Sequence, residues 1–447
     1  MLHLVQTSIG EKITASPFIA RETMRAIALA AKMRMEGSLK VAVDDANGNP
    51  RLILNKGAAD DISPMIRIHD PLMIWDVLNK GGSVTFGEAY MDGKWDAVGN
   101  LAYGALIDPL TVILRNYTAF KRVIDGNFDH RREEYTKNLA DYGHDQESDA
   151  KSISEHYDYD GIEFYRPWLG QTMMYSSGLH TDQCPQGINF GVTGNTLDDL
   201  QQRKINRIIT RLNPKEGETV LEIGCGWGNF GIEVAKQRKA NVIGITLSDG
   251  QLEVAQRRVF EEGLGERVSF IKQDFRDTAA SGQQFDHIAS IGMAEHVGDF
   301  PGYVDAVKQM MKEGREALLH YITVEGTPEE YKRYLEEIDF MQKYIFTNGR
   351  LASVHTSKDA FNKAGLTLIN HFSFGPSYGH TLREWNRKFQ QAWPTIQAKN
   401  PKMFTPRFKR MWEFYLCACA ASFYAGTISV NHFHLYKGGQ APAFTLA

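Results

Sequence analysis

Residues 220–228 read Val-Leu-Glu-Ile-Gly-Cys-Gly-Trp-Gly, an apolar segment followed by three alternating glycines. A helix-like stretch, Asn229 to Gln237, comes directly after them. Many α/β sheets bind a ligand at a glycine-rich turn that joins a strand to the following helix. Glycine lets a ligand approach the backbone because it has no side chain. The stretch therefore predicts a cofactor-binding turn at Gly224, Gly226 and Gly228.

The spacing of these glycines distinguishes between two cofactors. A dinucleotide-binding turn has the pattern G-x-G-x-x-G, with an acidic residue roughly 20 positions later at the end of the second strand. Here the pattern is G-x-G-x-G, and the second expected strand ends in Thr246-Leu247-Ser248 without a carboxylate. A G-x-G-x-G turn after an acidic strand residue such as Glu222 is typical of S-adenosylmethionine methyltransferases. The turn therefore predicts S-adenosylmethionine rather than NAD.

The composition describes a globular protein with more than one domain. A chain of 447 residues is expected to form two or three domains, and a net charge of −4 gives no basis for nucleic-acid binding. The four cysteines lack C-x-x-C pairs, which favours a reducing compartment and predicts no metal site. The N-terminus shows no secretory signal. The longest weakly polar run, Tyr415 to Ile428, is shorter than the roughly 18 residues of a membrane span. We therefore expect a cytoplasmic protein.

Residues 1–130 are expected to form a smaller α+β domain. Thr23 to Met35 has apolar residues at helical spacing with basic residues among them, which predicts either a domain helix or a helix on a lipid surface. Leu39 to Val43 and Arg51 to Leu54 flank an Asn-Gly turn, which predicts a hairpin. The polar residues 131–155 that follow are expected to be a linker.

Residues 156–447 are expected to form an α/β domain. Helix-like and strand-like segments alternate there, which predicts a mostly parallel sheet with helices on both faces, the Rossmann-like sheet of class I methyltransferases. The expected strands are Thr219–Ile223, Asn241–Ile245, Val268–Lys272, Asp286–Ile291 and Ala317–Ile322, and the expected helices are Leu200–Leu212, Asn229–Gln237, Gly250–Glu261 and Tyr303–Met311.

Ligands bind such a sheet outside the carboxyl ends of its strands, where polar residues occur here. Gln251 follows the second strand, and its amide either binds ribose hydroxyls or is an ordinary polar group on a helix. Asp274 follows the third strand, with Phe275 and Arg276 after it. The Asp274 carboxylate would accept the adenine amino group while Phe275 packs on the ring; the alternative is an exposed loop aspartate.

Two titratable residues follow the fourth strand. Glu295 and His296 lie in Gly292-Met293-Ala294-Glu295-His296-Val297-Gly298. Glu295 would serve as a general base for an alcohol or amine substrate. Since adjacent residues in a helical turn point in different directions, we expect one of the two to be functional and the other structural. The fifth strand brings His320 and Ile322 to the same edge of the sheet.

Over roughly residues 150–437 the chain resembles the cyclopropane fatty acid synthase family, which includes the mycolic acid methyltransferases. Long motifs occur in the family's order, and the resemblance implies that Tyr175, Ser176, Thr246 and Leu247 also contact the cofactor. The motifs are His156-Tyr157-Asp158, Phe164-Tyr165, Trp168-Leu169, Met174-Tyr175-Ser176, residues 220–228, Gly244–Ser248 with Gln251, Gly292–Gly298, Lys343–Gly349 and Phe408–Trp412.

The resemblance implies methyl transfer from S-adenosylmethionine to a cis double bond of a phospholipid acyl chain. An alkene is a poor nucleophile and the developing carbocation must be shielded from water, so an apolar, aromatic-lined pocket is expected. The resemblance further implies that a bound bicarbonate ion takes the proton, held by Glu295, His320, Tyr378 and the backbone of Ser177 and Ile322. Glu295 would then orient the base rather than act as one.

Two residues depart from the family pattern. Ser177 stands where the family usually has cysteine, and Leu179 stands where it has an aromatic residue. Both a cyclopropane product and a methylene or methyl-branched product therefore stay open. Cys419 lies at a position proposed as an active-site cysteine in the family. Since its neighbours are small and apolar, we interpret it as part of a packed helix.

The N-terminal domain resembles that of the longer bacterial members, which implies a homodimer and access to lipid. The implied partners are unsaturated phospholipid acyl chains, met by peripheral contact with the membrane surface. A small-molecule N- or O-methyltransferase is the alternative, because it would share the cofactor half of the site. A lipid carrier with a vestigial cofactor site is a third possibility, and the intact glycines argue against it.

Overall fold

The computed structural model describes residues 17–56, 64–80, 82–125, 162–184, 190–336 and 338–439. These residues divide into two compact units. Unit 1 takes the described residues of Met1–Leu139, Lys332–Ile345 and Leu382–Thr427, and unit 2 those of Ala140–Tyr331, Phe346–Thr381 and Ile428–Ala447. Residues 332–345 and 382–427 thus belong to unit 1, whereas the sequence assigned them to the 156–447 domain. The expected linker, 131–155, lies outside the described residues.

Unit 2 contains one large sheet whose strand order is β11-β12-β9-β8-β5-β6-β7, with β10 (Ala352–Ser353) beside β9. The central strands are parallel, and β12 runs antiparallel to both β9 and β11. The predicted α/β class is confirmed. The strands are β5 (Thr219–Ile223), β6 (Asn241–Thr246), β7 (Val268–Lys272), β8 (Phe285–Ile291), β9 (Met311–Val324), β11 (Thr367–Ser373) and β12 (Ile428–Lys437).

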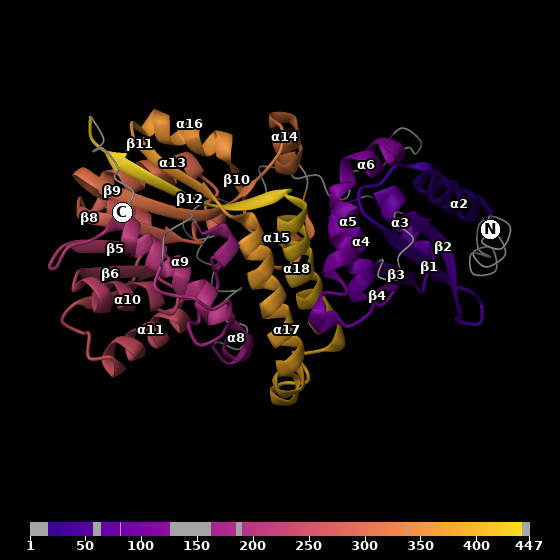
Figure 1. Ribbon diagram of the computed structural model, residues 1–447, viewed down its shortest axis with the longest axis horizontal. Helices are drawn as coiled ribbons and strands as arrows, with labels where there is room; N and C mark the ends of the chain where they lie inside the picture. The colour runs from indigo at the N-terminus through magenta and orange to yellow at the C-terminus, as the bar shows by residue number, and fades with distance from the viewer. Residues whose placement is uncertain are drawn as a thin grey trace. The chain divides into compact units, whose positions relative to one another are not determined.

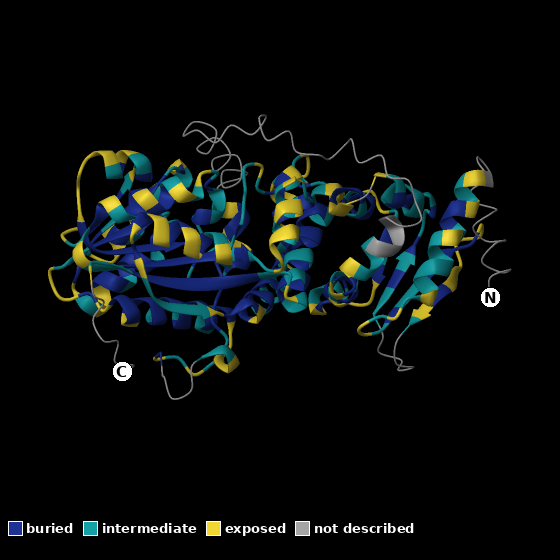
Figure 2. Cartoon of the chain, turned by 90° about the horizontal axis from the view of Figure 1, so that it is seen from above, coloured by how far each residue is buried: buried dark blue, intermediate teal, exposed yellow. Residues whose placement is uncertain are grey.

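Helices cover both faces of this sheet (Figure 1). Side chains alternate across each strand, so Val220 packs with helices α9 to α11 while Leu221 packs with α13 and α16. Figure 2 shows the strands buried between these layers. The helices of unit 2 are α8 (Ile162–Leu169), α9 (Leu197–Leu212), α10 (Asn229–Arg238), α11 (Asp249–Glu261), α12 (Phe275–Ala280), α13 (Phe300–Met310), α16 (Val354–Ala364) and the first turns of α17 (Gly375–Lys399); α14 (Pro328–Glu336) passes from unit 2 into unit 1.

Unit 1 contains a four-stranded sheet of order β2-β1-β3-β4. The predicted hairpin is confirmed as β1 and β2, and the predicted helix Thr23–Met35 occurs as α2 (Pro17–Lys32). The strands are β1 (Leu39–Asp44), β2 (Pro50–Lys56), β3 (Met65–Ile68) and β4 (Trp95–Val98), and the helices are α3 (Leu72–Lys80), α4 (Gly82–Met91), α5 (Ile107–Arg115), α6 (Tyr117–Asp125), α15 (Phe340–Tyr344), α18 (Pro406–Ala425) and the remainder of α17.

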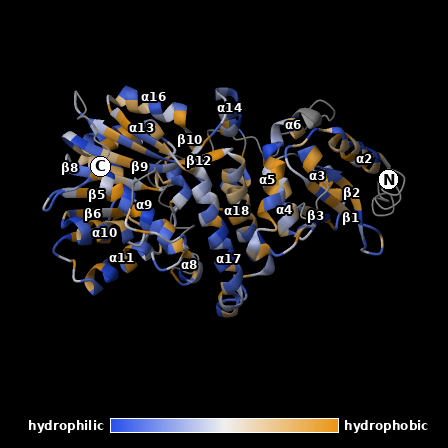
Figure 3. Ribbon diagram, viewed as in Figure 1, coloured by the Kyte–Doolittle hydropathy of each residue, from blue (hydrophilic) through white to orange (hydrophobic). Residues whose placement is uncertain are grey.

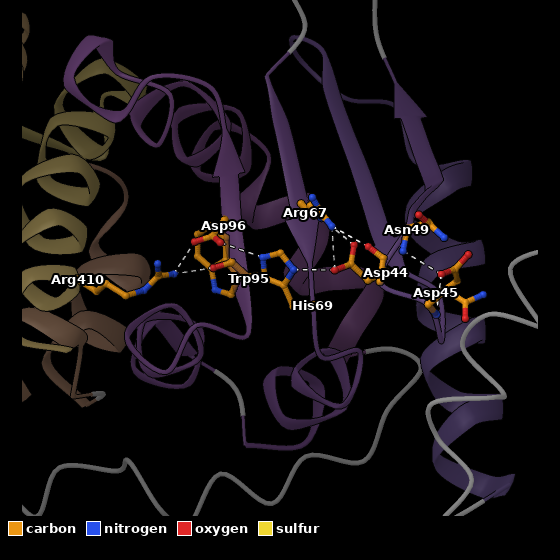
Figure 4. A network of polar contacts seen from close by, with 10 residues as sticks. Asp44, Asp45, Asn49, Arg67, His69, Trp95, Asp96 and Arg410 are labelled. Carbon is orange, nitrogen blue, oxygen red and sulfur yellow. Dashed lines mark hydrogen bonds and ion pairs between the residues drawn. The ribbon is translucent and has the colours of Figure 1, made fainter. Parts of the chain in front are cut away.

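A chain of ion pairs shows why α18 belongs to unit 1 (Figure 4). Asp44 of β1 accepts hydrogen bonds from Arg67 and from His69 Nδ1, each at 2.8 Å. The other ring nitrogen of His69 lies 2.9 Å from Asp96 of β4. Asp96 in turn accepts from Arg410 of α18 at 2.7 Å. Since Asp96 and Arg410 lie more than 300 residues apart in the chain, local sequence patterns do not reveal that α18 belongs to unit 1.

The helices carry polar and apolar residues side by side, as Figure 3 shows. Within the described part of the chain, every helix is too short or too polar to cross a membrane. The apolar run around Tyr415 belongs to α18, where Phe414 packs against Phe86, Trp95 and Phe340.

Candidate active site

A cavity of about 970 Å³, counting the space open to solvent, lies at the carboxyl ends of β5, β6, β7 and β8. The loops after these strands line it together with residues 173–176. All but one of the cofactor residues predicted from the sequence line this cavity. They are Tyr175, Ser176, Glu222, Gly224, Gly226, Thr246, Leu247, Gln251, Asp274, Phe275 and Arg276.

The three glycines of the turn serve different purposes, although all have positive φ. A Cβ atom on Gly224 would lie 2.8 Å from Met293 Cγ, so this position needs glycine for close packing. Gly228 does not line the cavity; it precedes α10, and a Cβ atom there would lie 2.6 Å from Phe270. At Gly226 a Cβ atom would meet open space within the cavity. Gly226 is therefore where a ligand can approach the backbone.

A buried acid and a buried base hold the loops beneath the cavity. Glu222 Oε2 accepts the N–H of Gly231 at 3.1 Å, and Lys204 Nζ donates to Ser176 Oγ at 2.7 Å. Burial raises the pKa of Glu222 to about 8 and lowers the pKa of Lys204 to about 7. Lys204 thus fixes the segment that carries Tyr175, while Glu222 fixes the first turn of α10.

The expected ribose and adenine contacts come from the helix starts after β6 and β7. Gln251 Oε1 accepts from Thr246 Oγ1 at 3.0 Å, so its amide NH₂ is the group that would meet ribose hydroxyls. Asp274 caps α12 by accepting the N–H of Arg276 at 2.7 Å, and it is only 3% exposed. Arg276 lies over the ring of Phe275, with Cζ 4.7 Å from the centroid. Asp274 is therefore not the exposed loop residue of the alternative interpretation.

Aromatic rings from α8 pack against two residues of the cavity lining. Tyr165 lies 5.5 Å from Tyr175 and 5.6 Å from Trp227, and Trp168 lies 5.7 Å from Tyr175, measured between ring centroids. Aromatic faces attract positive charge, so this cluster suits a cationic cofactor.

Glu295 lies in the loop after β8 and is half-buried. Its Oε1 accepts the N–H of Ile322 at 2.9 Å, whereas its Oε2 has no hydrogen-bond partner among the described residues. Burial raises the pKa of this carboxyl to about 7. His320 lies two residues before Ile322 on β9, so both side chains point to the same face of the sheet. The structure thus brings Glu295 and Ile322 together.

Ser177 and Tyr378 come from two segments that are tied together. Gly178 N–H donates to Thr381 Oγ1 at 3.0 Å, and His180 N–H donates to Ser377 Oγ at 2.9 Å. Both acceptors flank Tyr378 in the first turns of α17. Ser177 itself is fully buried, and its hydroxyl donates to the carbonyl of Gly178 at 2.6 Å. The serine hydroxyl is therefore turned onto its own backbone.

Comparison with known proteins identifies the family of this chain. Residues 144–433 match the family described as mycolic acid cyclopropane synthetase. The chain belongs to this family. It is 30% identical over 392 residues to the tuberculostearic acid methyltransferase UfaA1 of Mycobacterium tuberculosis, covering 86% of each protein. It is 32% identical over 374 residues to the cyclopropane-fatty-acyl-phospholipid synthase of Escherichia coli K12, covering 82% of this chain and 86% of that protein.

A solved structure of a mycolic acid cyclopropane synthase has a similar fold. The mycolic acid cyclopropane synthase CmaA1, crystallised in complex with SAH and CTAB, superposes with a TM-score of 0.56 at 26% identity. The match covers 64% of this chain and 98% of that one. The resemblance stated from the sequence motifs is confirmed, and the protein is an S-adenosylmethionine-dependent methyltransferase.

Sequence reasoning left open whether Glu295 or His296 is the functional residue, and it missed Met173, Lys204 and Arg207. His296 lines the cavity, and burial lowers its pKa to about 4, so a neutral imidazole faces the cavity. Met173 also lines the cavity and has φ of 54°, an unusual angle for a residue with a side chain. Lys204 and Arg207 are buried on α9, and basic residues on an otherwise amphipathic helix were the available signal.

One group of potential metal ligands occurs among the described residues. His180, Asp182 and His380 place ligand-type atoms within 4.8 Å of one another. His180 Nδ1 lies 2.5 Å from Asp182 Oδ1, and the two imidazole rings stack with centroids 4.4 Å apart. Stacked rings direct their in-plane lone pairs alongside one another rather than toward one ion. The group is a hydrogen-bonded pair with a stacked ring.

Cys419 lies on α18, in unit 1. Its Sγ is 3.8 Å from Met341 Sδ, and burial raises the pKa of the thiol. Because only the thiolate is a good nucleophile, this environment disfavours a reactive cysteine.

Proposed function

We propose that the protein transfers a methyl or methylene group from S-adenosylmethionine to the cis double bond of an unsaturated phospholipid acyl chain. The observation that carries this proposal is the buried Oε2 atom of Glu295, which has no hydrogen-bond partner among the described residues. An enzyme that methylates an amine or a phenol would also use a carboxylate, as its general base. A carboxylate already held by a backbone amide, with one oxygen unpaired in a buried site, suits a ligand that donates a hydrogen bond to it.

The chain's own residues suit the cofactor. Gly226 leaves room at the backbone, Gln251 presents an amide to a ribose, and Tyr175 presents a ring to the sulfonium. When bound, S-adenosylmethionine supplies an electrophilic methyl group. The aromatic rings of α8 exclude water from this region, which matters because water would capture the carbocation formed from an alkene.

We further propose that a bicarbonate ion binds at Glu295. When bound, bicarbonate supplies the base for the proton that the methylated acyl chain loses. Glu295 would accept its O–H, while His320, Tyr378 and the backbone N–H of Ser177 would donate to its oxygens. The N–H of Ile322 donates to Glu295 instead, so we assign Ile322 to holding the carboxylate in place. This differs from the sequence expectation, which placed the Ile322 amide on the ion.

Location and assembly are part of the same proposal. A phospholipid acyl chain lies in a bilayer, so the protein would contact the membrane peripherally from the cytoplasmic side. A homodimer is proposed on the family resemblance of the N-terminal domain alone.

Mass spectrometry of lipids from a host that makes oleoyl phospholipids, expressing this chain, tests the proposal. We expect acyl chains that are heavier by one CH₂ unit, which are absent from cells expressing Glu295→Gln. Proton NMR of the extracted lipids distinguishes a cyclopropane ring from a methylene or methyl branch, and thereby decides the product.

The same purified protein should be offered amines and phenols with S-adenosylmethionine. Methylation of these compounds without any change in acyl chains would contradict the lipid proposal and support the small-molecule class.

A further inference from the structure

Three buried side chains form a hydrogen-bonded row that ends at His320. Arg207 of α9 donates from Nη1 to Nδ1 of His432 on β12. His432 Nε2 lies 2.9 Å from Nδ1 of His320 on β9. Arg207 and His320 are each 1% exposed and His432 is 0% exposed. Water therefore has little access to any group in the row.

The direction of these hydrogen bonds follows from the chemistry of arginine. A guanidinium group can only donate, so Nδ1 of His432 must accept and cannot carry a proton. The proton of the neutral His432 ring is then on Nε2, which donates to Nδ1 of His320. Nδ1 of His320 must accept in turn. Its proton is consequently on Nε2, at the other side of the ring.

Packing fixes the row in this direction. The Cζ of Arg207 lies 4.1 Å from the ring centroid of Phe372, and Phe374 packs edge-on against His432 at 4.8 Å. His432 and His320 are also paired residues in the β12–β9 register. None of the three side chains can therefore turn away without opening the sheet or the α9 contact.

We infer that Arg207 and His432 are positioning residues that hold His320 in its neutral form with the proton on Nε2. The inference rests on the proposed function, in which His320 donates a hydrogen bond to bicarbonate. A ring with its proton on Nδ1 would present a lone pair to that anion and repel it. Arg207 would thus decide, through His432, which nitrogen of His320 donates.

Burial and the surrounding charges also favour the neutral form of both histidine rings. Burial, followed by the cations Lys204 and Arg207, keeps the pKa of His320 well below its ordinary value. Burial and then Arg207, His320, Lys204 and His434 do the same for His432. Arg211 and Cys184 are the further titratable groups beside Arg207. Among these described groups no carboxylate contributes, so protonation of either ring is opposed from every side.

Two substitutions of His432 test the inference. In His432→Leu the donor to His320 is lost, and we expect both tautomers of His320 in ¹⁵N NMR spectra of histidine-labelled protein. In His432→Gln the amide oxygen can accept from Arg207 and the amide nitrogen can donate to His320. We expect this variant to keep the single Nε2–H tautomer of the wild type.

Methyl-transfer rates should follow the tautomers. Outer partners of a functional histidine typically contribute about 10- to 100-fold, so we expect a loss of this size in His432→Leu and recovery in His432→Gln. Unchanged His320 resonances in His432→Leu would overturn the inference. Equal loss of activity in both variants, with intact melting temperatures, would also overturn it.

Arg207→Met is an independent variant, and it tests the inference if His432→Leu does not fold. Removing the cation frees Nδ1 of His432 to carry the proton, so we expect both tautomers of His320 in the ¹⁵N NMR spectra of this variant. A single Nε2–H tautomer of His320 in Arg207→Met would contradict the inference. Because the NMR measurement needs no substrate, a correct tautomer without lipid methylation would count against the proposed function alone.

Discussion

Glu295 and Cys419 are both half-buried, yet the structure predicts opposite results for their substitution. In Glu295→Gln the amide can still accept from Ile322 but presents an NH₂ group where a carboxylate oxygen stood. We expect kcat to fall by about a hundredfold or more, because the proposed bicarbonate base would lose the carboxylate that orients it. The measurement is transfer of radiolabelled methyl groups to phospholipid vesicles.

Cys419→Ala removes a thiol that contacts Met341 and is disfavoured as a thiolate. We expect it to keep most of the wild-type rate in the same assay. A loss as large as that of Glu295→Gln would show that the thiol takes part in the reaction.

Gly226 and Gly263 form a matched pair for the cofactor turn. Both have positive φ, and a Cβ atom on either would meet no other atom within 4 Å. An alanine at each site should therefore cost a similar amount, about 1–2 kcal/mol of unfolding free energy. Only Gly226→Ala places a methyl group in the cavity, so only this variant should weaken S-adenosylmethionine binding in calorimetry. Equal affinities for the two variants would exclude Gly226 from the cofactor site.

At the scale of elements, Asp286 joins the starts of three neighbouring strands. Its Oδ2 accepts the N–H of Thr219 on β5 at 3.0 Å and bonds Lys312 of β9 at 2.9 Å, while Oδ1 lies 3.2 Å from Arg315. Burial would raise the pKa of this carboxyl, but these donors together hold the pKa well below the ordinary 3.8. The ionised form is therefore the one that stabilises the sheet.

Asp286→Asn should lower the unfolding free energy at neutral pH by about 1.5–3 kcal/mol, the usual contribution of hydrogen bonds to a charged group. Because the folded pKa is lowered, this contribution is present above the unfolded value of 3.8 and is lost as pH falls below it. Denaturant unfolding curves at a series of pH values measure it. The exposed Asp305→Asn is the control, and the proposal fails if the two variants show the same pH dependence.

The elements differ in how well the sequence predicts them. β5 and β7 match their predicted bounds because each is a short apolar run between turn residues. β12 was not predicted, since Asn431, His432 and His434 interrupt its apolar residues although all three are buried. The cofactor half of the site follows the strand ends and was predicted. The row from Arg207 to His432 joins residues 225 positions apart, and such contacts exist only after folding.

At the scale of the whole molecule, the N-terminal domain is not an independent module. From the sequence, removing residues 1–130 is expected to impair activity on vesicles. The structure predicts a larger effect, because within unit 1 Tyr90 donates to Glu413 at 3.1 Å and Arg410 donates to the carbonyl of Trp95 at 2.9 Å. Deletion would leave the buried Glu413 without this donor and expose apolar residues of α18, including Phe414.

We therefore expect the deleted protein to be insoluble or to lose cooperative thermal unfolding. Supplying residues 1–130 from a second gene should restore soluble protein, because the missing partners of α18 are then present. A soluble deletion variant with the melting temperature of the full chain would contradict this expectation.

The division of unit 1 among three stretches of chain also has a consequence for synthesis on the ribosome. Its first stretch ends at Leu139, but its last stretch ends only at Thr427. At translation speeds of about 5–20 residues per second, the first stretch waits roughly 15–60 s for its remaining partners. During this time the apolar faces that α18 later covers are open to chaperones. The yield of this protein in a cell should therefore depend on translation speed and chaperone supply more strongly than its final stability alone would suggest.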